Sequence, residues 1–259
     1  FRTVIMEYYA SNRRSFPWRE TRDPYRILVS EIMLQQTQAP RVVEKYLSFI
    51  KRFPTVTVLA TARPSAVLKE WQGLGYNRRG LNLKRAAEEI CGRFKGKFPR
   101  RYEELLSLPG VGPATAGDLL AFAWNEPRAV IETNIRSVFL HFFFKDSENV
   151  SDAQLLPLIE ASLDRANPRD WYYALMDYGA MLKKSLPNPS RRSKHYARQS
   201  AFKGSNRELR SLILKYVLAY PRQQAETIIE ALGAESAAVT RNLEAMAKEG
   251  LISVKKSKG

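Results

Sequence analysis

A short glycine-rich turn between two helical segments constrains this chain more than any other feature of its sequence. Residues 103–120 read EELLSLPGVGPATAGDLL, where an amphipathic segment ends at Leu108 and a second helical segment follows Gly112. Glycines at 110 and 112 let backbone N–H groups approach a ligand closely, and the positive end of the second helix lies at the same place. This geometry suits a phosphate oxygen, which positions a nucleic acid without reading its sequence. The alternative is an ordinary helical hairpin whose glycines serve only the turn.

Helical periodicity dominates the chain up to residue 182. Residues 30–38 and 42–53 place apolar side chains three and four positions apart, with charged residues between them. Prolines divide the remainder into segments of helical length, and alternating strand-like runs are nearly absent. We therefore predict one all-α domain over residues 1–182.

The charge balance of the chain indicates a negatively charged partner. The 259 residues include 42 Lys and Arg against 26 Asp and Glu, which gives a net charge of +16, and 44% hydrophobic residues are enough for a packed core. We expect nucleic acid rather than a membrane as the partner, because no apolar run approaches the ~18 residues of a membrane span. The alternative is a basic protein whose charges are scattered over a solvated surface.

The residues that commonly hold metals are scarce. Cys91 is the only cysteine, and His141 and His195 are the only histidines. These residues cannot form an intramolecular disulfide or a four-thiolate zinc or iron–sulfur site, and a mixed His/Cys metal centre is not expected. The first ten residues lack the order of a signal peptide. We expect an intracellular protein, cytoplasmic and nucleoid-associated if its source is prokaryotic.

The composition changes after residue 182. Residues 183–205 are predicted to form a basic connector, since residues 183–204 contain seven Lys or Arg and no acidic residue. Three helical patterns and a short β-like run follow it, at residues 208–220, 225–232, 236–248 and 251–256. This order predicts a winged-helix-like domain over residues 206–259. A plain helical interaction module is the alternative.

Six short motifs stand in a fixed order within residues 1–182. They are FPWR at 16–19, PY at 24–25, SEIMLQQTQ at 30–38, WQGLGY at 71–76, LPGVG at 108–112 and MDYGA at 176–180. In this order the chain resembles the MutY-type adenine DNA glycosylases of the helix-hairpin-helix superfamily, rather than endonuclease III. The resemblance implies an all-α fold of two helical lobes with the active site between them. It also implies double-stranded DNA with a mispaired or damaged base as the partner, and we expect the protein to act as a monomer.

Glu31 has the setting required of a general acid. It lies on a largely apolar helical segment between Val29 and Ile32. Cleaving an N-glycosidic bond to a purine requires a proton donor, and burial raises the pKa of a carboxylic acid enough to make it one near neutral pH. The resemblance implies that Glu31 protonates adenine and helps to activate water. The alternative is that Glu31 caps a helix or forms an ion pair.

The second carboxylate departs from the family pattern. Where the family has Asp-Gly-Asn-Val, this chain has Glu132-Thr-Asn-Ile135, so the carboxylate is one methylene longer. The resemblance assigns this position to stabilising positive charge on the sugar or orienting water, and we expect Glu132 to keep that role. Asn134 fits a cap at a helix start or a phosphate contact.

Ala114 stands where bifunctional relatives carry a lysine that forms a Schiff base and cuts the strand. Alanine has no nucleophile, so we expect base removal without lysine-based lyase activity. The resemblance places four residues around the flipped base: Trp18, Arg19, Leu34 and Ala114. Trp18 on its own also fits a core position.

The resemblance also assigns residues that contact DNA. Tyr76 matches a residue that wedges beside the base opposite the target, although a core tyrosine is the alternative, and Gln36 matches the residue that enters the vacated space. The remaining expected contacts are Gly110, Val111 and Gly112 of the hairpin, Asn134, and the basic residues Lys183, Lys184, Arg191 and Arg192.

Most MutY-like proteins hold a [4Fe–4S] cluster through four cysteines that follow the last motif. The matching positions here are Lys183, Ser190, Ser193 and Gln199, so we predict a clusterless member with no cofactor. A monovalent or divalent cation at the hairpin is left open. Without a cluster, order in this segment is expected to come from the packing of Leu186, Tyr196 and Phe202. Residues 206–259 also do not resemble the Nudix-like domain of MutY proteins, so we expect that domain to be absent.

Three functions are compatible with these features. The first is a monofunctional DNA glycosylase of base excision repair that removes adenine from mispairs with guanine or 8-oxoguanine. The second is a glycosylase for thymine, uracil or another damaged base, because the wall residue Ala114 and the acid Glu132 are both changed. The third is a catalytically inactive DNA-binding protein, which the presence of Glu31 argues against.

Overall fold

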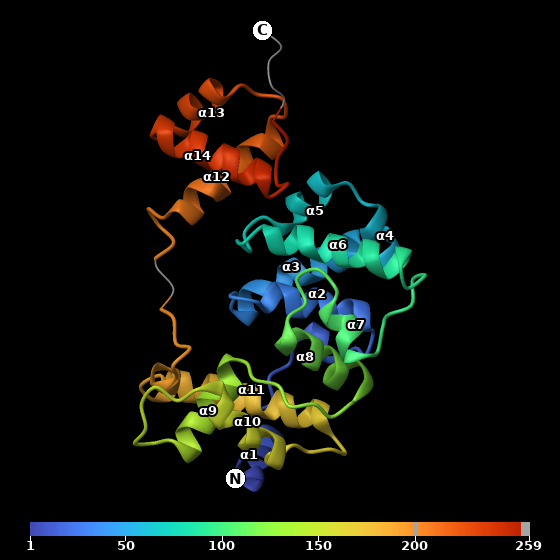
Figure 1. Ribbon diagram of the computed structural model, residues 1–259, viewed down its shortest axis with the longest axis vertical. Helices are drawn as coiled ribbons and strands as arrows, with labels where there is room; N and C mark the ends of the chain where they lie inside the picture. The colour runs from blue at the N-terminus through green and yellow to red at the C-terminus, as the bar shows by residue number, and fades with distance from the viewer. Residues whose placement is uncertain (199–200, 255–259) are drawn as a thin grey trace. The chain divides into compact units, whose positions relative to one another are not determined.

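The computed structural model describes residues 1–198 and 201–254. Within these ranges the chain forms α-helices and short 3₁₀ helices and contains no β-strand; a single isolated bridge joins Val150 and Ser193 (Figure 1). The predicted all-α architecture is confirmed. No helix in the described ranges is long and apolar enough to cross a membrane.

The chain divides into two compact units, each built from two separate stretches of sequence. Unit 1 comprises residues 1–31 and 98–198, and unit 2 comprises residues 32–97 together with the described part of 199–259. The division falls within helix α2 (Pro24–Leu34), directly after Glu31. The boundaries at residues 182 and 205 proposed from sequence remain a prediction.

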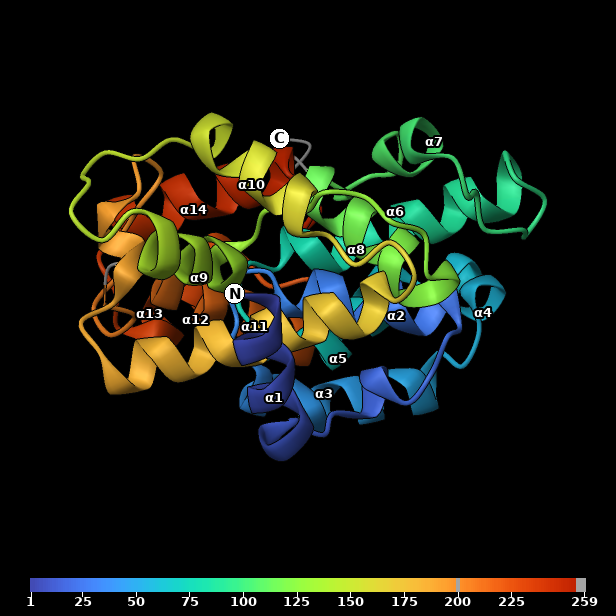
Figure 2. The same ribbon diagram turned by 90° about the horizontal axis from the view of Figure 1, so that it is seen from below.

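Unit 1 is assembled around one long helix. Helix α11 (Pro168–Ser185) packs against α1 (Arg2–Asn12), α8 (Pro113–Trp124) and α9 (Thr133–Phe143), and α1 is seen beside α11 in Figure 2. The other elements of the unit are η1 (Pro17–Arg19), α7 (Tyr102–Leu106), α10 (Asp152–Ser162) and η2 (Pro189–Arg192). Large aromatic side chains fill the core, since Phe122, Phe139, Trp171 and Tyr172 are all fully buried.

Unit 2 joins the middle of the chain to its C-terminal helices. Helix α6 (Arg78–Gly92) packs on α4 (Val56–Thr61) and α5 (Pro64–Trp71), and α3 (Ala39–Arg52) packs on α5. Helices α12 (Asn206–Ala219), α13 (Ala225–Leu232) and α14 (Ser236–Lys248) form a small bundle, with α12 against α5 (Figure 1). Leu68 and Leu81 share one apolar cluster with Ile213, Val239 and Met246. The C-terminal helices therefore share a core with α5 and α6.

The three C-terminal helices lie where the sequence predicts them, but the β-like run after them is wrong over residues 251–254. These residues form no strand, and residues 255 and 256 of the predicted run lie outside the described residues. Gly250 takes a left-handed φ of 75°, and the N–H of Leu251 bonds to the carbonyl of Met246. This is the ending of a helix that buries the next apolar residue, and Leu251 is 6% exposed. The winged-helix-like identity of this region stays a prediction.

The basic connector is ordered by residues other than those predicted. Leu186, Tyr196 and Phe202 are exposed by 44%, 40% and 50%, so the expectation that they pack is wrong. Ser190 and Ser193 are buried instead, and backbone hydrogen bonds tie Val150 to the connector. The first residues of the connector continue α11 to Ser185. Ser190 ties the segment to α9 through its hydrogen bond to Ser137, and Ser193 lies in the isolated bridge to Val150.

Candidate active site

Glu31 and Asp118 form a carboxyl pair within unit 1. Glu31 lies on α2 and is partly buried, and Asp118 lies on the second turn of α8 with 4% of its surface exposed. Their side chains are hydrogen-bonded to each other. Asp118 is not among the residues predicted from sequence, although it is the only charged residue of the otherwise apolar helix α8 and could have been singled out on that ground.

Burial shifts the titration of both groups in the same direction. The pKa of Glu31 is raised to about 8, first by burial and then by the negative charge of Glu132, while Arg19 opposes the rise. The pKa of Asp118 is also raised well above its usual value, first by burial and then by the charges of Glu31 and Glu132. A carboxyl group with a pKa of about 8 is protonated at neutral pH, which is the condition for a general acid.

Glu132 caps helix α9 with its own carboxylate. Its Oε1 accepts hydrogen bonds from the backbone N–H groups of Asn134 (2.7 Å) and Ile135 (2.9 Å), and Oε2 accepts one from Asn134 Nδ2 (3.3 Å). Helix N-termini favour negative charge at this position. The extra methylene of Glu132 is accommodated in a cap that fixes the carboxylate at the start of α9.

Two glycines allow the segments that carry these carboxyl groups to approach each other. A Cβ on Gly179 of α11 would lie 2.3 Å from the carbonyl oxygen of Asn134, and a Cβ on Gly117 of α8 would lie 2.5 Å from Val130 Cγ2. The hydroxyl of Tyr172 also accepts a hydrogen bond from the N–H of Val130 at 3.1 Å. Close helix packing thus fixes the loop before Glu132 and the start of α9.

Arg19 is bound in an ion pair of its own. Its guanidinium donates to both oxygens of Asp177 at 2.8 Å and packs over the ring of Tyr173, 4.4 Å from its centroid. Arg19 is 4% exposed, and its Nε is buried without a partner among the described residues. The pKa of Asp177 is lowered: burial raises it, and the hydrogen bonds and charges of Arg19 and Arg14 outweigh that effect. Arg19 therefore lies near Glu31 but is paired with another carboxylate.

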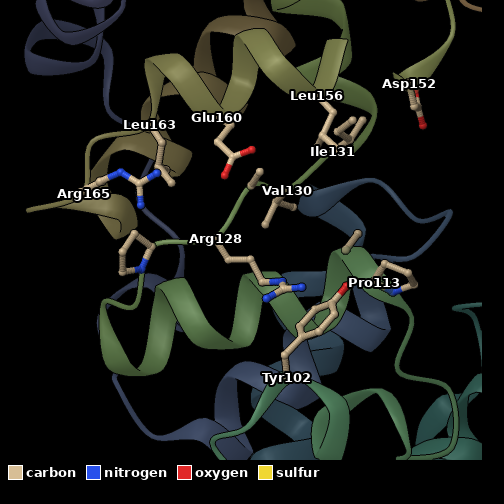
Figure 3. A pocket seen from close by; sticks show the side chains of 13 residues that line it. Tyr102, Pro113, Arg128, Val130, Ile131, Asp152, Leu156, Glu160, Leu163 and Arg165 are labelled. Carbon is tan, nitrogen blue, oxygen red and sulfur yellow. The ribbon is translucent and has the colours of Figure 1, made fainter. Parts of the chain in front are cut away.

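The other residues predicted around the flipped base occupy different places. Trp18 is 3% exposed and stacks on Phe16, with ring centroids 4.8 Å apart. Leu34 ends α2 in unit 2 and is partly buried. Ala114 lines a cavity of about 540 Å³ between the loop 127–131, the start of α8 and α10. Figure 3 shows Arg128 reaching across the ring of Tyr102 at one side of this cavity.

The hairpin has the predicted form. Helix α7 ends at Leu106, the turn places Gly110 at a left-handed φ of 81°, and α8 begins at Pro113 after Gly112. The N–H of Val111 closes the turn onto the carbonyl of Leu108 at 3.1 Å. Gly110 is exposed, Gly112 is partly buried, and Val111 is 6% exposed and belongs to the core. A ligand at this turn would therefore meet the two glycines rather than the valine side chain.

Tyr76 and Gln36 lie at exposed positions of unit 2, each in a left-handed backbone conformation. Their φ angles are 47° and 58°, values that non-glycine residues adopt rarely and at an energetic cost. Tyr76 is 40% exposed, so it is not a core tyrosine. The helical spacing of residues 30–38 continues beyond the helix itself, because α2 ends at Leu34 and the chain turns at Gln36.

A single buried arginine holds both of these turns. Arg79, 9% exposed, donates hydrogen bonds of 3.0–3.1 Å to the carbonyls of Ile32, Met33, Leu74 and Gly75 and to Thr37 Oγ1, and it also bonds the carbonyl of Gln35. Its guanidinium lies 5.5 Å from the centroid of the Tyr76 ring. Burial lowers the pKa of Arg79 to about 10, so it remains charged at neutral pH. Arg79 is not identified from sequence because nothing in its spacing separates it from Arg78.

The C-terminal helices also contact Tyr76. Arg207 at the start of α12 donates to Tyr76 Oη at 3.2 Å, and its guanidinium lies 5.6 Å from the ring centroid. Two arginines from different helices of unit 2, Arg79 and Arg207, therefore pack against the side chain of Tyr76.

The predicted DNA-contacting lysines and arginines of the connector divide into two kinds. Lys184 and Arg191 are exposed. Lys183 is partly buried and donates to Asn134 Oδ1 at 2.9 Å, and Arg192 donates to the carbonyls of Lys145 and Leu140 near the end of α9. Lys183 and Arg192 are thus committed to contacts within the protein, whereas Lys184 and Arg191 remain accessible to a polyanion.

The residues at the cluster positions do not fit a four-thiolate iron–sulfur site. Ser190 and Ser193 are buried, and Ser190 Oγ is hydrogen-bonded to Ser137 Oγ at 2.6 Å, while Lys183 bonds Asn134. Gln199 lies outside the described residues. None of these residue types supplies a thiolate. In the described ranges no three His, Cys, Asp or Glu side chains are grouped to hold a metal ion. A monovalent or divalent cation at the hairpin remains a prediction.

Comparison with known proteins identifies the family. Residues 29–157 match the model of the HhH-GPD superfamily base excision DNA repair proteins. A thymine/uracil-DNA glycosylase of Methanothermobacter thermautotrophicus is 31% identical over 185 residues, which cover 70% of this chain and 84% of that protein. The chain belongs to the HhH-GPD superfamily.

Other relatives agree with this membership. An adenine DNA glycosylase of Buchnera aphidicola subsp. Baizongia pistaciae is 33% identical over 186 residues, which cover 70% of this chain and 52% of that protein. The solved structure of a thermostable thymine-DNA glycosylase aligns with a TM-score of 0.64 and 30% identity, over 70% of this chain and 85% of that one. The predicted helix-hairpin-helix glycosylase fold and the similarity to MutY-type proteins are confirmed. This HhH-GPD chain spans about half the length of the adenine DNA glycosylase it matches.

Proposed function

We propose that this protein is a monofunctional DNA glycosylase of base excision repair that removes adenine from mispairs with guanine or 8-oxoguanine. The observation that carries the proposal is Glu31, a carboxyl group with a pKa of about 8, placed beside Glu132 in an HhH-GPD chain. DNA binding is supported by the net charge of +16, the hairpin turn at Gly110 and the exposed side chains of Lys184 and Arg191.

The proposed reaction uses each carboxyl group in a different protonation state. Glu31 gives its proton to the departing base as the glycosidic bond breaks, and positive charge develops on the sugar. The Glu132 carboxylate, held by the start of α9, stabilises that charge. The Glu31 carboxylate then takes a proton from a water molecule as the oxygen of that water bonds to the sugar carbon. The products are the free base and an abasic sugar, and Glu31 is protonated again.

An acid of this kind favours a purine substrate. Adenine departs readily only when it is protonated, and Glu31 supplies that proton at neutral pH. Thymine and uracil depart as anions, which the neighbouring negative charge of Glu132 would repel. The identity of the base opposite adenine rests on the family resemblance. Ala114 supports the absence of lysine-based strand cleavage, because no nucleophile stands at that position.

Excision of thymine or uracil is the second candidate function. It is favoured by the Methanothermobacter relative, since this chain covers 84% of a protein described as a thymine/uracil-DNA glycosylase. The third possibility is a catalytically inactive DNA-binding protein, and the experiment must distinguish it from the two glycosylase functions.

The test is product analysis on duplexes that each carry one A·G, A·8-oxoguanine, T·G or U·G pair, under single-turnover conditions with and without alkali. Release of adenine, with strand cleavage only after alkali, is expected. Glu31→Gln is expected to lower the rate by roughly 10²–10⁴-fold. Release of thymine or uracil alone would establish the second function. Cleavage without alkali would contradict the monofunctional assignment, and no release from any duplex, with Glu31→Gln indistinguishable from wild type, would indicate an inactive scaffold.

A further inference from the structure

Asp118 is a buried acid that the proposed mechanism does not use. It is 4% exposed on α8 and is hydrogen-bonded to the side chain of Glu31. Its Oδ1 is buried and receives no hydrogen bond from an N–H or O–H of the described residues. A buried carboxylate would normally be paired with a cation or with several donors. Asp118 lacks that support at Oδ1.

The contact between Asp118 and Glu31 itself requires a proton. Two ionised carboxylates have no hydrogen to share and repel each other at close range in a buried site. Glu132 adds a third carboxyl group nearby. Arg19 is the cation near Glu31, and both of its terminal nitrogens are committed to Asp177. The pair is therefore stable only with at least one proton between its members.

The placement of the two residues determines which one holds that proton more firmly. Asp118 lies on the second turn of α8 among the fully buried side chains of that helix, whereas Glu31 is only partly buried and lies nearer to Arg19. The less buried partner ionises more readily. A protonated Asp118 can then donate a hydrogen bond to Glu31, and to the Glu31 carboxylate once Glu31 has given its own proton to the base.

We propose that Asp118 is a positioning residue that stays protonated through the reaction and donates a hydrogen bond to Glu31. This inference rests on the proposed glycosylase function for its consequence in catalysis. When Glu31 transfers its proton to the base, the O–H of Asp118 stabilises the new carboxylate and holds it for the attack of water. The proton of Glu31 goes to the base, that of the attacking water returns to Glu31, and the proton of Asp118 is not consumed.

Asparagine separates this role from that of an ionised aspartate. The amide of Asp118→Asn has nearly the same shape, is neutral, and still has an N–H to donate to Glu31. If Asp118 is neutral in the native protein, the pH profile of single-turnover excision in Asp118→Asn should overlay that of wild type, with rates within about threefold. If Asp118 is ionised, the substitution removes a negative charge beside Glu31, and the alkaline limb of the profile moves to lower pH. That result would overturn the proposal.

Asp118→Leu keeps the branching of the side chain, with a larger volume, and removes the donor. Loss of the hydrogen bond to the Glu31 carboxylate is expected to lower the rate at least tenfold and to move the alkaline limb to higher pH. A folding defect would instead lower the fraction of active protein without moving the alkaline limb of the pH profile. An unchanged rate in Asp118→Leu would show that the hydrogen bond has no role.

An infrared measurement tests the protonation of Asp118 without any substrate. The full-length protein is labelled with ¹³C at the aspartate carboxyl carbons, and its spectrum at pH 7 is compared with that of labelled Asp118→Asn. The difference should contain the C=O band of a carboxylic acid. Asp152→Asn is the control, because Asp152 is held ionised by Arg136 at 2.7 and 2.8 Å and its loss should remove a carboxylate band. A carboxylate band lost from Asp118→Asn would refute the proposal, whether or not the protein excises any base.

Discussion

Glu31→Gln is expected to make the protein more stable at neutral pH while it lowers the rate of base excision by roughly 10²–10⁴-fold. Glutamine has the shape of the protonated side chain and does not titrate. The folded protein raises the pKa of Glu31 from 4.5 to about 8, chiefly through burial. The favourable contribution of the proton is therefore complete below pH 4.5 and is lost as the pH rises through 8. Wild type loses this contribution over the window, whereas Glu31→Gln has no group at this position to lose a proton.

The size of the effect follows from the shift. Between pH 4.5 and 8 the folded state holds one proton that the unfolded state has released, so the free energy of unfolding falls by about 1.4 kcal/mol per pH unit. At pH 7 the accumulated difference between Glu31→Gln and wild type is about 3 kcal/mol as an upper bound, because partial exposure and residual structure in the unfolded state both reduce it.

Urea unfolding of both proteins at intervals from pH 5 to pH 8.5 measures this difference. The difference in unfolding free energy should grow steadily with pH and level off above pH 8. Glu103→Gln on α7 is the matched control, since Glu103 is an exposed glutamate, and the growth of the Glu31→Gln difference with pH is compared with that of Glu103→Gln. A constant difference for Glu31→Gln across this range would refute the buried, protonated state of Glu31 and with it the general-acid role.

Three further substitutions test the packing around the site and the turns of unit 2. Gly179→Ala places a Cβ 2.3 Å from a backbone oxygen of Asn134 and should lower the unfolding free energy by about 1–3 kcal/mol. The control is Gly92→Ala, whose Cβ meets nothing within 4 Å and should not lower it. Equal effects of the two substitutions in urea titrations would argue against the close contact. Arg79→Lys should cost about 2–4 kcal/mol by the same assay, because a lysine cannot reach all the carbonyls that the guanidinium satisfies, and a cost below 1 kcal/mol would contradict that role. Ser190→Ala should cost about 1 kcal/mol through loss of the buried hydroxyl pair with α9, and a stabilised variant would refute this contribution.

Much of the fold follows from the sequence because helices are specified locally. Proline positions, apolar spacing and the hairpin glycines determine where α8 begins and where α12, α13 and α14 begin and end, and these bounds agree closely with prediction. The errors arise where tertiary contacts decide. The end of α2 is set by the hydrogen bonds of Arg79, and the run after Gly250 is set by burial of Leu251 against the helices of unit 2. Neither contact leaves a periodic pattern in the sequence.

The candidate site was predictable in its acids and not in its supporting residues. Glu31 stands on an apolar helical segment, and the family resemblance points to both Glu31 and Glu132 because each occupies a motif position. Asp118 stands out in sequence as the charged residue of an apolar helix, but its contact with Glu31, like those of Arg79 with the turns of unit 2, joins residues distant in sequence and is not visible there. The predicted apolar packing of the connector failed for a related reason, because its order comes from Ser190, whose role depends on a hydroxyl of α9.

The ion pair between Arg19 and Asp177 explains how a basic protein can keep an acid protonated. A guanidinium bound directly to Glu31 would favour the carboxylate and lower its pKa. Instead Asp177, in the MDYGA motif at residues 176–180, accepts two hydrogen bonds from Arg19 at 2.8 Å, and Arg14 binds the same carboxylate. The Asp177 carboxylate thereby offsets the positive charge of Arg19, and burial remains the largest influence on the pKa of Glu31. Asp177 of the last motif thus helps Glu31 of α2 to keep its raised pKa, although the two residues are about 145 positions apart in the sequence.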